Sequence, residues 1–528
     1  MPLHRRCRLE PTGRRSRQNE RKPFASKSRG FIITSRSVSF GRVFLTARFG
    51  ASLAIVTLAA VVLWGLFAPE HRLGRVGVFR VQGFDYDAFY CGGRVTGHGD
   101  PYELEPLATC ERTLVKPALV LPVPLPPYDL AALHLQALPN ERRARFIWIG
   151  LLLASIIAAA AFLQPVVGMP WPVLVGAVLL GNGRDELPLG QIVPFVLLGI
   201  AGAAYFLERG KASIAGVFAL VTLVEPHLGV PVILGCVIFI PRARVAIGVG
   251  VVALAALSLR VAGVAGCLDY VRRVLPFHAL AEAPFVYQFS MTYLLTMLHV
   301  PEHLAIGAGT LTFVAMLVAG LVVAGRLARK SGSTSFIALV PPAFVLLGGT
   351  FIKQQQLIVA IPLCFALLRL ARARSEATWS FVTLFVVMLA WQPVFDVAKS
   401  DLEVLALSFV VATWSLLKFP AMKRIQYSVA VTAAYGVILG IEHMHFAGHV
   451  ILATPSVQSF TREAQGNADL ASYPWGVFMR TIPAYADLTI GFAIAKIVTW
   501  LGLGSMVFLT VRFTRDPFST SAGETAIT

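Results

Sequence analysis

Long apolar stretches alternate with short basic segments along most of this chain. An α-helix rises about 1.5 Å per residue, so a run of about 20 apolar residues crosses a hydrocarbon layer of about 30 Å. The pattern predicts membrane segments at 42–68, 142–164, 170–182, 190–207, 212–224, 227–240, 245–265, 303–327, 335–350, 357–370, 379–394, 402–418, 426–446 and 487–511. We expect about 11–14 spans in one all-α polytopic bundle, with an even number of crossings.

Some of these segments are shorter than a straight crossing requires. The pair 212–224 and 227–240 is expected to form a short hairpin that bends at Glu225-Pro226. Backbone groups at such a bend are costly in hydrocarbon, so other helices must shield it from lipid. Glu225 and His227 then lie in the membrane zone, where ionisable side chains are typically functional or paired. Here they either pair with each other or belong to a site.

Basic residues between the apolar segments fix the expected orientation, because such clusters favour the cytoplasmic side of a membrane. The clusters are Arg209 and Lys211; Arg242 and Arg244; Arg326, Arg329 and Lys330; Arg369, Arg372 and Arg374; Lys418, Lys423 and Arg424; and Arg512 and Arg515. This threading gives a helical domain at 42–511, a cytoplasmic tail at 512–528 and cytoplasmic termini. Three long segments face outward, at 69–141, 266–302 and 447–486.

Composition agrees with a membrane protein. The 528 residues are 56% hydrophobic and 14% charged, whereas a soluble domain carries about 25% charged residues. The net charge of +18 comes in part from residues 1–48, which hold about a dozen Lys and Arg against two acids. We interpret residues 1–41 as a disordered cytoplasmic arm beside the membrane and 42–68 as a retained anchor. Nucleic acid is therefore not an expected partner, and membrane lipids are.

Cysteines and histidines give no metal pattern. The six cysteines lack metal-ligand spacing, and His443, His445 and His449 do not share one helical face. We expect neither a metal nor another cofactor. Cys91 and Cys110 fall in the same predicted outer segment, where either a disulfide or two free thiols are chemically reasonable.

The stretch "GFDYDAFYCGGRVTGHGDPY", residues 83–102, places paired acids, aromatics and glycines where the first helix leaves the membrane. It contains Asp85-Tyr86-Asp87-Ala88-Phe89-Tyr90, then Gly92-Gly93-Arg94, then Gly99-Asp100-Pro101-Tyr102. Further along come Pro126-Pro127-Tyr128-Asp129-Leu130, Ala137-Leu138-Pro139, Gly190-Gln191 and Arg209-Gly210-Lys211. In this order the motifs resemble glycosyltransferase family 87, over about residues 80–245. Glu225 departs from that pattern, since the family usually has Lys before the proline.

The resemblance implies a C-type glycosyltransferase-like helical bundle with a large first outer loop. Such an enzyme takes a hexose or pentose, for example mannose, from a polyprenyl phosphate sugar and inverts the anomeric centre. The acceptor is a lipid or a glycan on the outer face of the cytoplasmic (inner) membrane. A secondary transporter is the main alternative, because a broken helix with intramembrane Glu225 and His227 is also typical of transport sites. A membrane protein that binds lipid-linked sugars without catalysis is a third possibility.

The acceptor hydroxyl must lose a proton, so one carboxylate is the minimum equipment of such a site. By resemblance this base is Asp85, with Asp87 as the nearby alternative. Residues two apart on a helix diverge by about 200°, so the two acids cannot both face one substrate atom. The competing interpretation of Asp85 is a helix N-cap on a solvated loop.

The phosphate of the donor needs a cation. The candidates are Arg142 and Arg143 at the start of the second span, and Lys353 in "FIKQQQ". Arg142, Arg143 and Arg145 lie outside in this threading, against the charge rule. Either they hold an anion, or they snorkel at a helix start, or the threading slips by one crossing. Lys353 has the same snorkelling alternative. Arg272 and Arg273 in the second outer segment are further candidates for the phosphate, but their pattern favours a solvated amphipathic face.

Two further residues are candidates for binding the sugar. Gln191 follows Gly190 at a helix start, where its amide either binds sugar hydroxyls or caps its own helix. Tyr102 ends the Gly99-Asp100-Pro101-Tyr102 stretch, in which Pro sets the backbone and Asp bonds nearby amides. That stretch is predicted to form a turn, with Tyr102 as a candidate to line the sugar site.

Overall fold

The computed structural model describes residues 84–114, 120–137, 139–179, 182–183, 186–389, 451–453, 473–481 and 488–515. Several predictions therefore lie outside the described residues: the basic arm 1–41, the anchor 42–68, the spans 402–418 and 426–446, the three histidines near residue 445, and most of the segment 447–486 and the tail 512–528. All described residues belong to one unit of the chain, residues 49–528.

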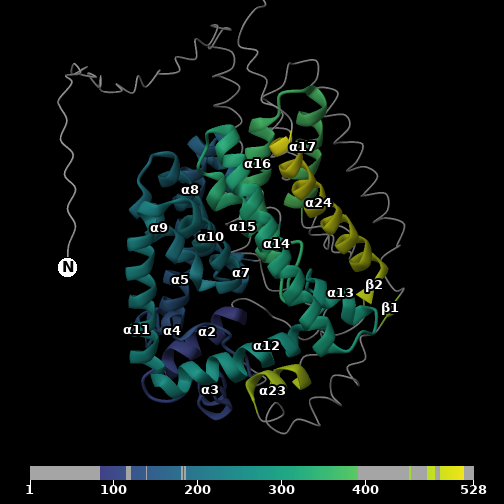
Figure 1. Cartoon of the computed structure of the whole chain (residues 1–528). Coiled ribbons are helices and arrows are strands. Elements are labelled where there is room, and N and C mark those ends of the chain that lie inside the picture. Colours follow the sequence, from purple (N-terminus) through teal and green to yellow (C-terminus); the bar gives the residue numbers. More distant parts are fainter. Residues whose placement is uncertain are drawn as a thin grey trace, which may run out of the picture. The chain divides into compact units, whose positions relative to one another are not determined.

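The described part is almost entirely helical (Figure 1). Its first half contains α2 (Phe84–Val95), α3 (Leu104–Glu111), α4 (Pro127–Gln136), α5 (Glu141–Leu163), α6 (Trp171–Leu179), α7 (Glu186–Leu189), α8 (Val193–Glu208), α9 (Ala212–Val221) and α10 (Pro226–Phe239). Its second half contains α11 (Arg244–Asp269), α12 (Leu275–Glu282), α13 (Met291–Met297), α14 (Glu302–Ser331), α15 (Phe336–Val345), α16 (Ile361–Leu370), α17 (Arg374–Met388), α23 (Pro474–Thr481) and α24 (Ile490–Arg515). Strands β1 (Ile451–Ala453) and β2 (Leu488–Thr489) form one short antiparallel pair.

Four helical segments of the described residues are long and apolar enough to cross a membrane: Glu141–Gly168, Pro241–Glu282, Glu302–Ser331 and Ala493–Arg515. Five shorter apolar helices accompany them: Val193–Glu208, Ala212–Val224, Pro226–Phe239, Phe336–Val345 and Gln354–Leu370. These elements follow the predicted segments in order, and most match them within a few residues in extent, while Pro241–Glu282 runs well beyond the predicted span 245–265. The prediction of a helical membrane protein is confirmed at this level.

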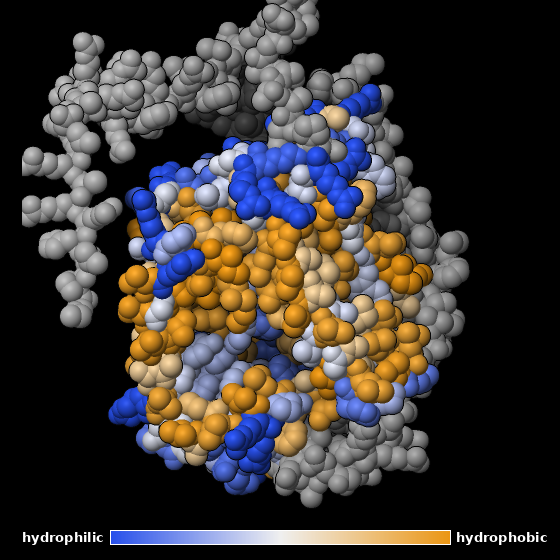
Figure 2. All heavy atoms as spheres, viewed as in Figure 1, coloured by the Kyte–Doolittle hydropathy of each residue, from blue (hydrophilic) through white to orange (hydrophobic). Residues whose placement is uncertain are grey.

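The exposed faces of the long helices are apolar. On α11 and α14, Val245, Val252 and Leu311 expose 76%, 69% and 70% of their surface. Figure 2 shows the resulting hydrophobic band, with hydrophilic side chains gathered above and below it. An apolar surface this wide would be unstable in water and is stable in contact with lipid.

The predicted bend at Glu225-Pro226 is present. A short 3-10 segment, Thr222–Val224, follows α9, and Glu225 leaves the helical region of backbone space with φ −125° and ψ 86°. Pro226 then starts α10, a position where its missing N–H leaves no hydrogen bond unmade. The bend turns the Glu225 side chain towards the cavity described below.

The segment 266–302, predicted as an outer loop, is mostly helical. α11 kinks at Gly263 and continues past residue 265, the predicted end of the span. It then passes through the π-helical turn Tyr270–Val274 into α12. From residue 84 onward, the first predicted outer segment contains three short helices, α2 to α4. Their apolar side chains pack with the start of α5, with α12 and with α23 in a hydrophobic core of their own.

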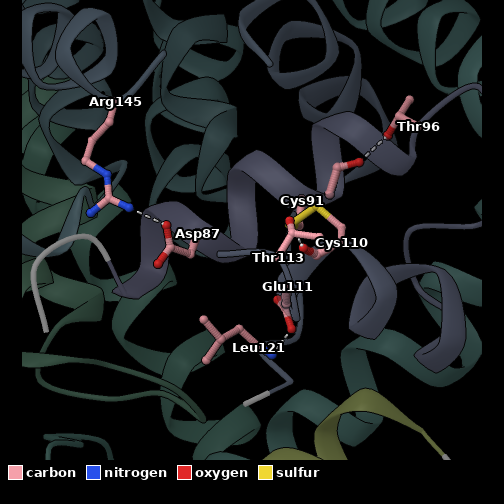
Figure 3. Close-up of a disulfide and its surroundings, with 9 residues drawn as sticks. Asp87, Cys91, Thr96, Cys110, Glu111, Thr113, Leu121 and Arg145 are labelled. Atoms are coloured by element: carbon pink, nitrogen blue, oxygen red, sulfur yellow. Dashed lines mark hydrogen bonds and ion pairs between the residues drawn. A yellow bond between two sulfur atoms is a disulfide. The ribbon is translucent and has the colours of Figure 1, made fainter. Parts of the chain in front are cut away.

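A disulfide joins Cys91 of α2 to Cys110 of α3 (Figure 3). The sequence left this pairing open, and the structure forms it. Beside it, the buried carboxyl of Glu111 accepts a hydrogen bond of 2.8 Å from the Leu121 amide. The bridge and this bond hold the segment 120–126, which forms part of the cavity wall, against α2 and α3.

Replacing both Cys91 and Cys110 with Ser should destabilise the protein by about 3 kcal/mol, because a loop of this size gains conformational entropy when it is opened. Thermal unfolding of the purified full chain, followed by intrinsic fluorescence, measures the effect as a lower melting temperature. Cys267→Ser is the control, since Cys267 forms no disulfide with another described cysteine. An unchanged melting temperature for the double variant would contradict a stabilising bridge.

Candidate active site

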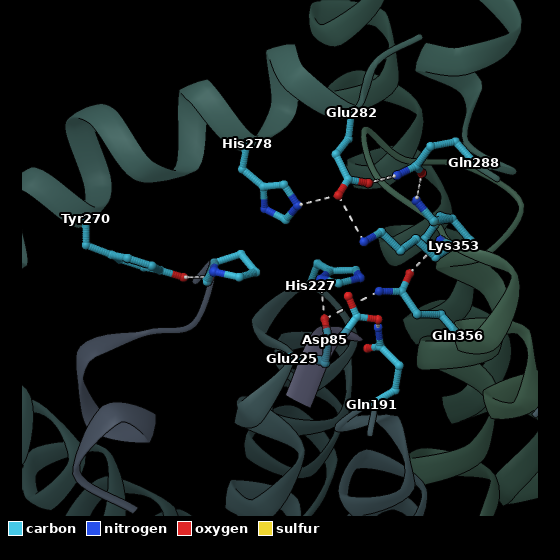
Figure 4. Close-up of polar contacts among 12 residues, drawn as sticks. Asp85, Gln191, Glu225, His227, Tyr270, His278, Glu282, Gln288, Lys353 and Gln356 are labelled. Atoms are coloured by element: carbon cyan, nitrogen blue, oxygen red, sulfur yellow. Dashed lines mark hydrogen bonds and ion pairs between the residues drawn. The ribbon is translucent and has the colours of Figure 1, made fainter. Parts of the chain in front are cut away.

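A cavity of about 410 Å³ lies between α2, α12, α23 and the loops around residues 225 and 352. Its polar lining is concentrated, with three carboxyl groups, two imidazoles, one amine and two amides, while most other lining side chains are apolar or aromatic. The polar residues are Asp85, Gln191, Glu225, His227, His278, Glu282, Lys353 and Gln356. Figure 4 shows these side chains pointing towards a common space.

Lys353 forms the central ion pair of the cavity. Its Nζ lies 2.9 Å from Oε1 of Glu282, a residue only 3% exposed. Burial lowers the pKa of Lys353, but the attraction of Glu282 and Asp85 outweighs it, and the pKa is raised overall. Lys353 is therefore a cation in this cavity and does not snorkel to its edge.

Gln288 fixes the geometry of this pair. Its Nε2 donates to Oε2 of Glu282 at 2.7 Å, and its Oε1 accepts from the Ile352 amide at 2.8 Å. The backbones of Gln288 and Lys353 also form an isolated antiparallel bridge. These bonds tie the loop that follows Glu282 at the end of α12 to the loop that carries Lys353.

α24 supports the same loops from outside the cavity. Lys496, 2% exposed, donates from Nζ to the carbonyl of Gln288, and it lies over the ring of Tyr293 at 4.1 Å from the ring centre. One turn later the Trp500 indole donates to the carbonyl of Phe289 at 2.9 Å. The last predicted span therefore positions the Glu282–Lys353 pair without lining the cavity.

Asp85 lies in the first turn of α2 and faces the cavity. Its carboxylate accepts a hydrogen bond from Nε2 of Gln191, which comes from the loop before α8. Burial raises the pKa of Asp85, while Lys353 and the Gln191 bond lower it by less. Asp85 thus lies within its helix rather than at the N-cap. A carboxylate whose pKa is raised above the usual aspartate range in a cavity has the environment of a proton acceptor.

Asp87 faces a different neighbourhood, as helix geometry predicts for residues two apart. Its Oδ1 accepts a 2.6 Å hydrogen bond from Arg145 (Figure 3). Arg145 also donates to Glu141 at 2.5 Å. Burial raises the pKa of Asp87 to about 7. Asp87 does not line the cavity, and its ion pair accounts for Arg145 at the start of α5.

The other candidates from the sequence lie apart from Asp85. Arg142 and Arg143 are exposed at the start of α5 and do not line the cavity. The buried hydroxyl of Tyr102 donates to the carbonyl of Leu125 at 2.7 Å, while the Tyr102 amide donates to Asp100 in the predicted turn. Tyr102 supports the cavity wall from behind. The structure therefore brings together Asp85, Gln191 and Lys353, and does not add Asp87, Arg142, Arg143 or Tyr102.

The expected contact between Glu225 and His227 is present, with His227 Nδ1 lying 3.4 Å from Oε2 of Glu225. Gln356 Nε2 donates to the same carboxyl oxygen at 3.4 Å. Both residues line the cavity, so the pair also belongs to the site. The two alternatives posed for these residues are not exclusive.

Sequence reasoning missed Glu282 and Trp475. Glu282 follows His278 by four residues, and its Oε1 lies 3.4 Å from Nε2 of that histidine. This i, i+4 pairing of His and Glu next to a long apolar segment is the signal that was available. Trp475 stacks on the His278 ring at 4.5 Å, a contact that no sequence pattern announces because nearly 200 residues separate the two.

Two buried nitrogen atoms at the cavity have no hydrogen-bond partner among the described residues: Nε2 of His227 and Nε1 of Trp475. Buried polar groups are rarely left unpaired unless a ligand or water satisfies them. With the aromatic faces of Phe351 and Trp475 beside them, they provide hydrogen bonds and an apolar platform for a polyhydroxylated ligand.

Within the described ranges, no three His, Cys, Asp or Glu side chains converge in a way that would hold a metal ion. The expectation that no cofactor is needed remains a prediction.

No family model, curated protein or solved structure matches this chain. The resemblance to glycosyltransferase family 87 rests on the order of motifs between residues 83 and 211 alone.

Proposed function

We propose that this protein is an integral-membrane glycosyltransferase of the C-type architecture. It transfers a sugar from a polyprenyl phosphate donor to a hydroxyl of a lipid or glycan acceptor, with inversion at the anomeric carbon. The observation that carries this proposal is a carboxylate and an ammonium, Asp85 and Lys353, which are both partly buried and face one cavity at the end of apolar helices. The motif order around Asp85 supports the same reaction class.

The reaction needs a base and an anion-stabilising group on opposite sides of the sugar. Asp85 accepts the proton of the acceptor hydroxyl while the oxygen of that hydroxyl forms the new bond to the anomeric carbon. The bond from that carbon to the phosphate oxygen breaks, and polyprenyl phosphate leaves with the electron pair. Lys353 balances the growing negative charge on the phosphate, a role that a preorganised cation fills well in a poorly hydrated cavity. Attack opposite to the leaving group accounts for inversion.

Access from the lipid supports a prenyl-linked donor. Figure 2 shows a hollow in the lower part of the hydrophobic band, beside α12 and the lower end of α14 in the view of Figure 1. Residues of α12, including His278 and Glu282, line the cavity. A donor with its sugar phosphate in the cavity then keeps its prenyl chain along the apolar helices.

The charge distribution supports an outward-facing active site. Basic residues occupy the opposite ends of the helices that begin at the cavity, as with Arg209 after α8 and Arg369 at the end of α16. By the positive-inside rule those ends face the cytoplasm. We propose a multi-pass protein of the cytoplasmic membrane with both termini inside.

Purified protein in proteoliposomes, given radiolabelled polyprenyl phosphate sugar and a membrane lipid extract, tests the proposal. Sugar should move to a second product while free polyprenyl phosphate accumulates in equal amount. A secondary transporter remains the second candidate, because the break at Glu225-Pro226 places ionisable groups inside the bundle. Solute flux across the liposome membrane without any sugar transfer would favour that alternative.

The rate of transfer should fall as the pH is lowered through the pKa of Asp85. Burial raises that pKa, so the base form is lost at a higher pH than for an exposed aspartate, which titrates near about 3.9. Gln191→Leu removes a hydrogen bond that lowers the pKa, so the acid limb should move further upward. A pH–rate profile of both proteins measures this. Coincident acid limbs would contradict the role of Gln191 in setting this pKa.

A further inference from the structure

A second cavity, of about 260 Å³, lies at the other end of the same helices. α8 starts beside Gln191, which lines the first cavity, and ends at Glu208 and Arg209, which line the second. With 16 residues, α8 separates the two cavities by about 24 Å along its axis. The second cavity is therefore at the opposite border of the hydrophobic band, outside the proposed active site.

Two arginines line this cavity. The guanidinium of Arg209 lies over the ring of Tyr205, 4.4 Å from the ring centre, which fixes its position. In the part of the chain that the structure describes, no ion pair joins Arg209 to an acid. Arg369 donates from Nη1 to the carbonyl of Pro165 at 2.9 Å, so its cationic group is held at the wall of the cavity.

The carboxylate that lines this cavity, Glu208, already accepts hydrogen bonds from the protein. Glu208 accepts hydrogen bonds from the hydroxyl of Ser333 and, at 3.1 Å, from the amide of Ser335. Its carboxylate thus ties the end of α8 to the loop after α14 and is directed at that loop. Ser331, Ser333 and Ser335 add hydroxyl groups to the cavity lining.

The surroundings of the cavity are strongly basic. Cations flank it in the last turn of α14, before α9 and after α16: Lys211, Arg329, Lys330, Arg372 and Arg374. The nearby acid of this end, Glu376, accepts from the amides of Arg372 and Ala373 and so caps α17. Such a field attracts anions, and basic pockets between membrane helices on the cytoplasmic side are typical sites for anionic lipid headgroups.

We propose that this cavity binds the phosphate of an anionic phospholipid headgroup. Val166, Phe336 and Leu370 make the rest of the wall apolar, which suits a ligand with acyl chains in the adjoining lipid. The volume is below the about 300–1,000 Å³ typical of sites for whole small molecules, and it fits a headgroup. This proposal does not depend on the proposed glycosyl transfer.

Native mass spectrometry of the full chain, released from nanodiscs of phosphatidylcholine with or without phosphatidylglycerol, tests the site. Phosphatidylglycerol should be retained selectively, and Arg209→Gln should weaken retention by about tenfold or more, since hydrogen bonds to charged groups are the strong ones. Lys211→Gln is the matched control, because it removes the same charge two residues away without lining the cavity. Because Arg209 is exposed, the Arg209→Gln variant should fold normally. The melting temperature of this variant in pure phosphatidylcholine checks that it does.

The lipid and a free phosphate ion are separated in a further arm. Inorganic phosphate added to phosphatidylcholine nanodiscs should leave the melting temperature unchanged if the site takes a lipid. If inorganic phosphate raised the melting temperature as much as phosphatidylglycerol does, the lipid would be overturned as the source of the bound phosphate. Equal loss of retention in Arg209→Gln and Lys211→Gln would show diffuse attraction to a basic surface and overturn the site itself.

Discussion

Asp85→Asn should lower the rate of sugar transfer by about 10²- to 10⁴-fold, the usual contribution of a positioned general base. Asparagine has nearly the shape of aspartate and keeps an oxygen that accepts the Gln191 hydrogen bond. Its amide cannot accept the proton of the acceptor hydroxyl. The loss should therefore appear in the rate at saturating substrate, with the melting temperature little changed.

Asp87→Asn is the matched control, since it makes the same change two residues later on α2. Asp87 pairs with Arg145 and does not line the cavity. We expect this variant to lose stability from the weakened ion pair while the transfer rate changes by less than about tenfold. Comparable losses of rate in the two variants would show that neither carboxylate is the base, and a larger loss in Asp87→Asn would reverse their roles.

The helical segments were predictable because hydropathy is a local property. Runs of apolar residues gave the positions of α8, α10, α14 and α24 to within a few residues, and the Glu225-Pro226 bend followed from the chemistry of proline. The continuation of α11 into α12 was less accessible. Charged residues such as Asp269 and Arg273 interrupt the apolar pattern there, yet they form an i, i+4 ion pair of 2.9 Å on a continuing helix.

The assembly of the site was only partly predictable, because it depends on which helix ends meet. Asp85 stands out by its motif, but its partner Gln191 lies 106 residues further along the chain. Lys353 was a candidate cation in the sequence and Glu282 was not, and the two become an ion pair only when α12 packs next to the loop before α16. Arg142 and Arg143 show the opposite case, since their charge suggested a phosphate site and their exposed position at the start of α5 removes them from the cavity.

Lys353→Met should destabilise the protein by about 3 kcal/mol and abolish measurable sugar transfer. The stability falls because Glu282, 3% exposed, loses its cation and keeps a buried charge. The transfer is lost because, among the residues that the structure describes, no other lysine or arginine lines the cavity to meet the leaving phosphate. Thermal unfolding and the transfer assay report the two effects separately.

Adding Glu282→Gln to Lys353→Met separates the structural role of the lysine from its role in the reaction. The glutamine keeps the shape of Glu282 and needs no counter-charge, so most of the lost stability should return, because replacing both members of a buried ion pair is far less costly than removing one. Gln288 can still bond the new side chain through its amide. Transfer should stay absent, since the phosphate still has no cation. Recovery of transfer together with stability would mean that Lys353 serves only to neutralise Glu282, and that the leaving group is stabilised by something other than this amine.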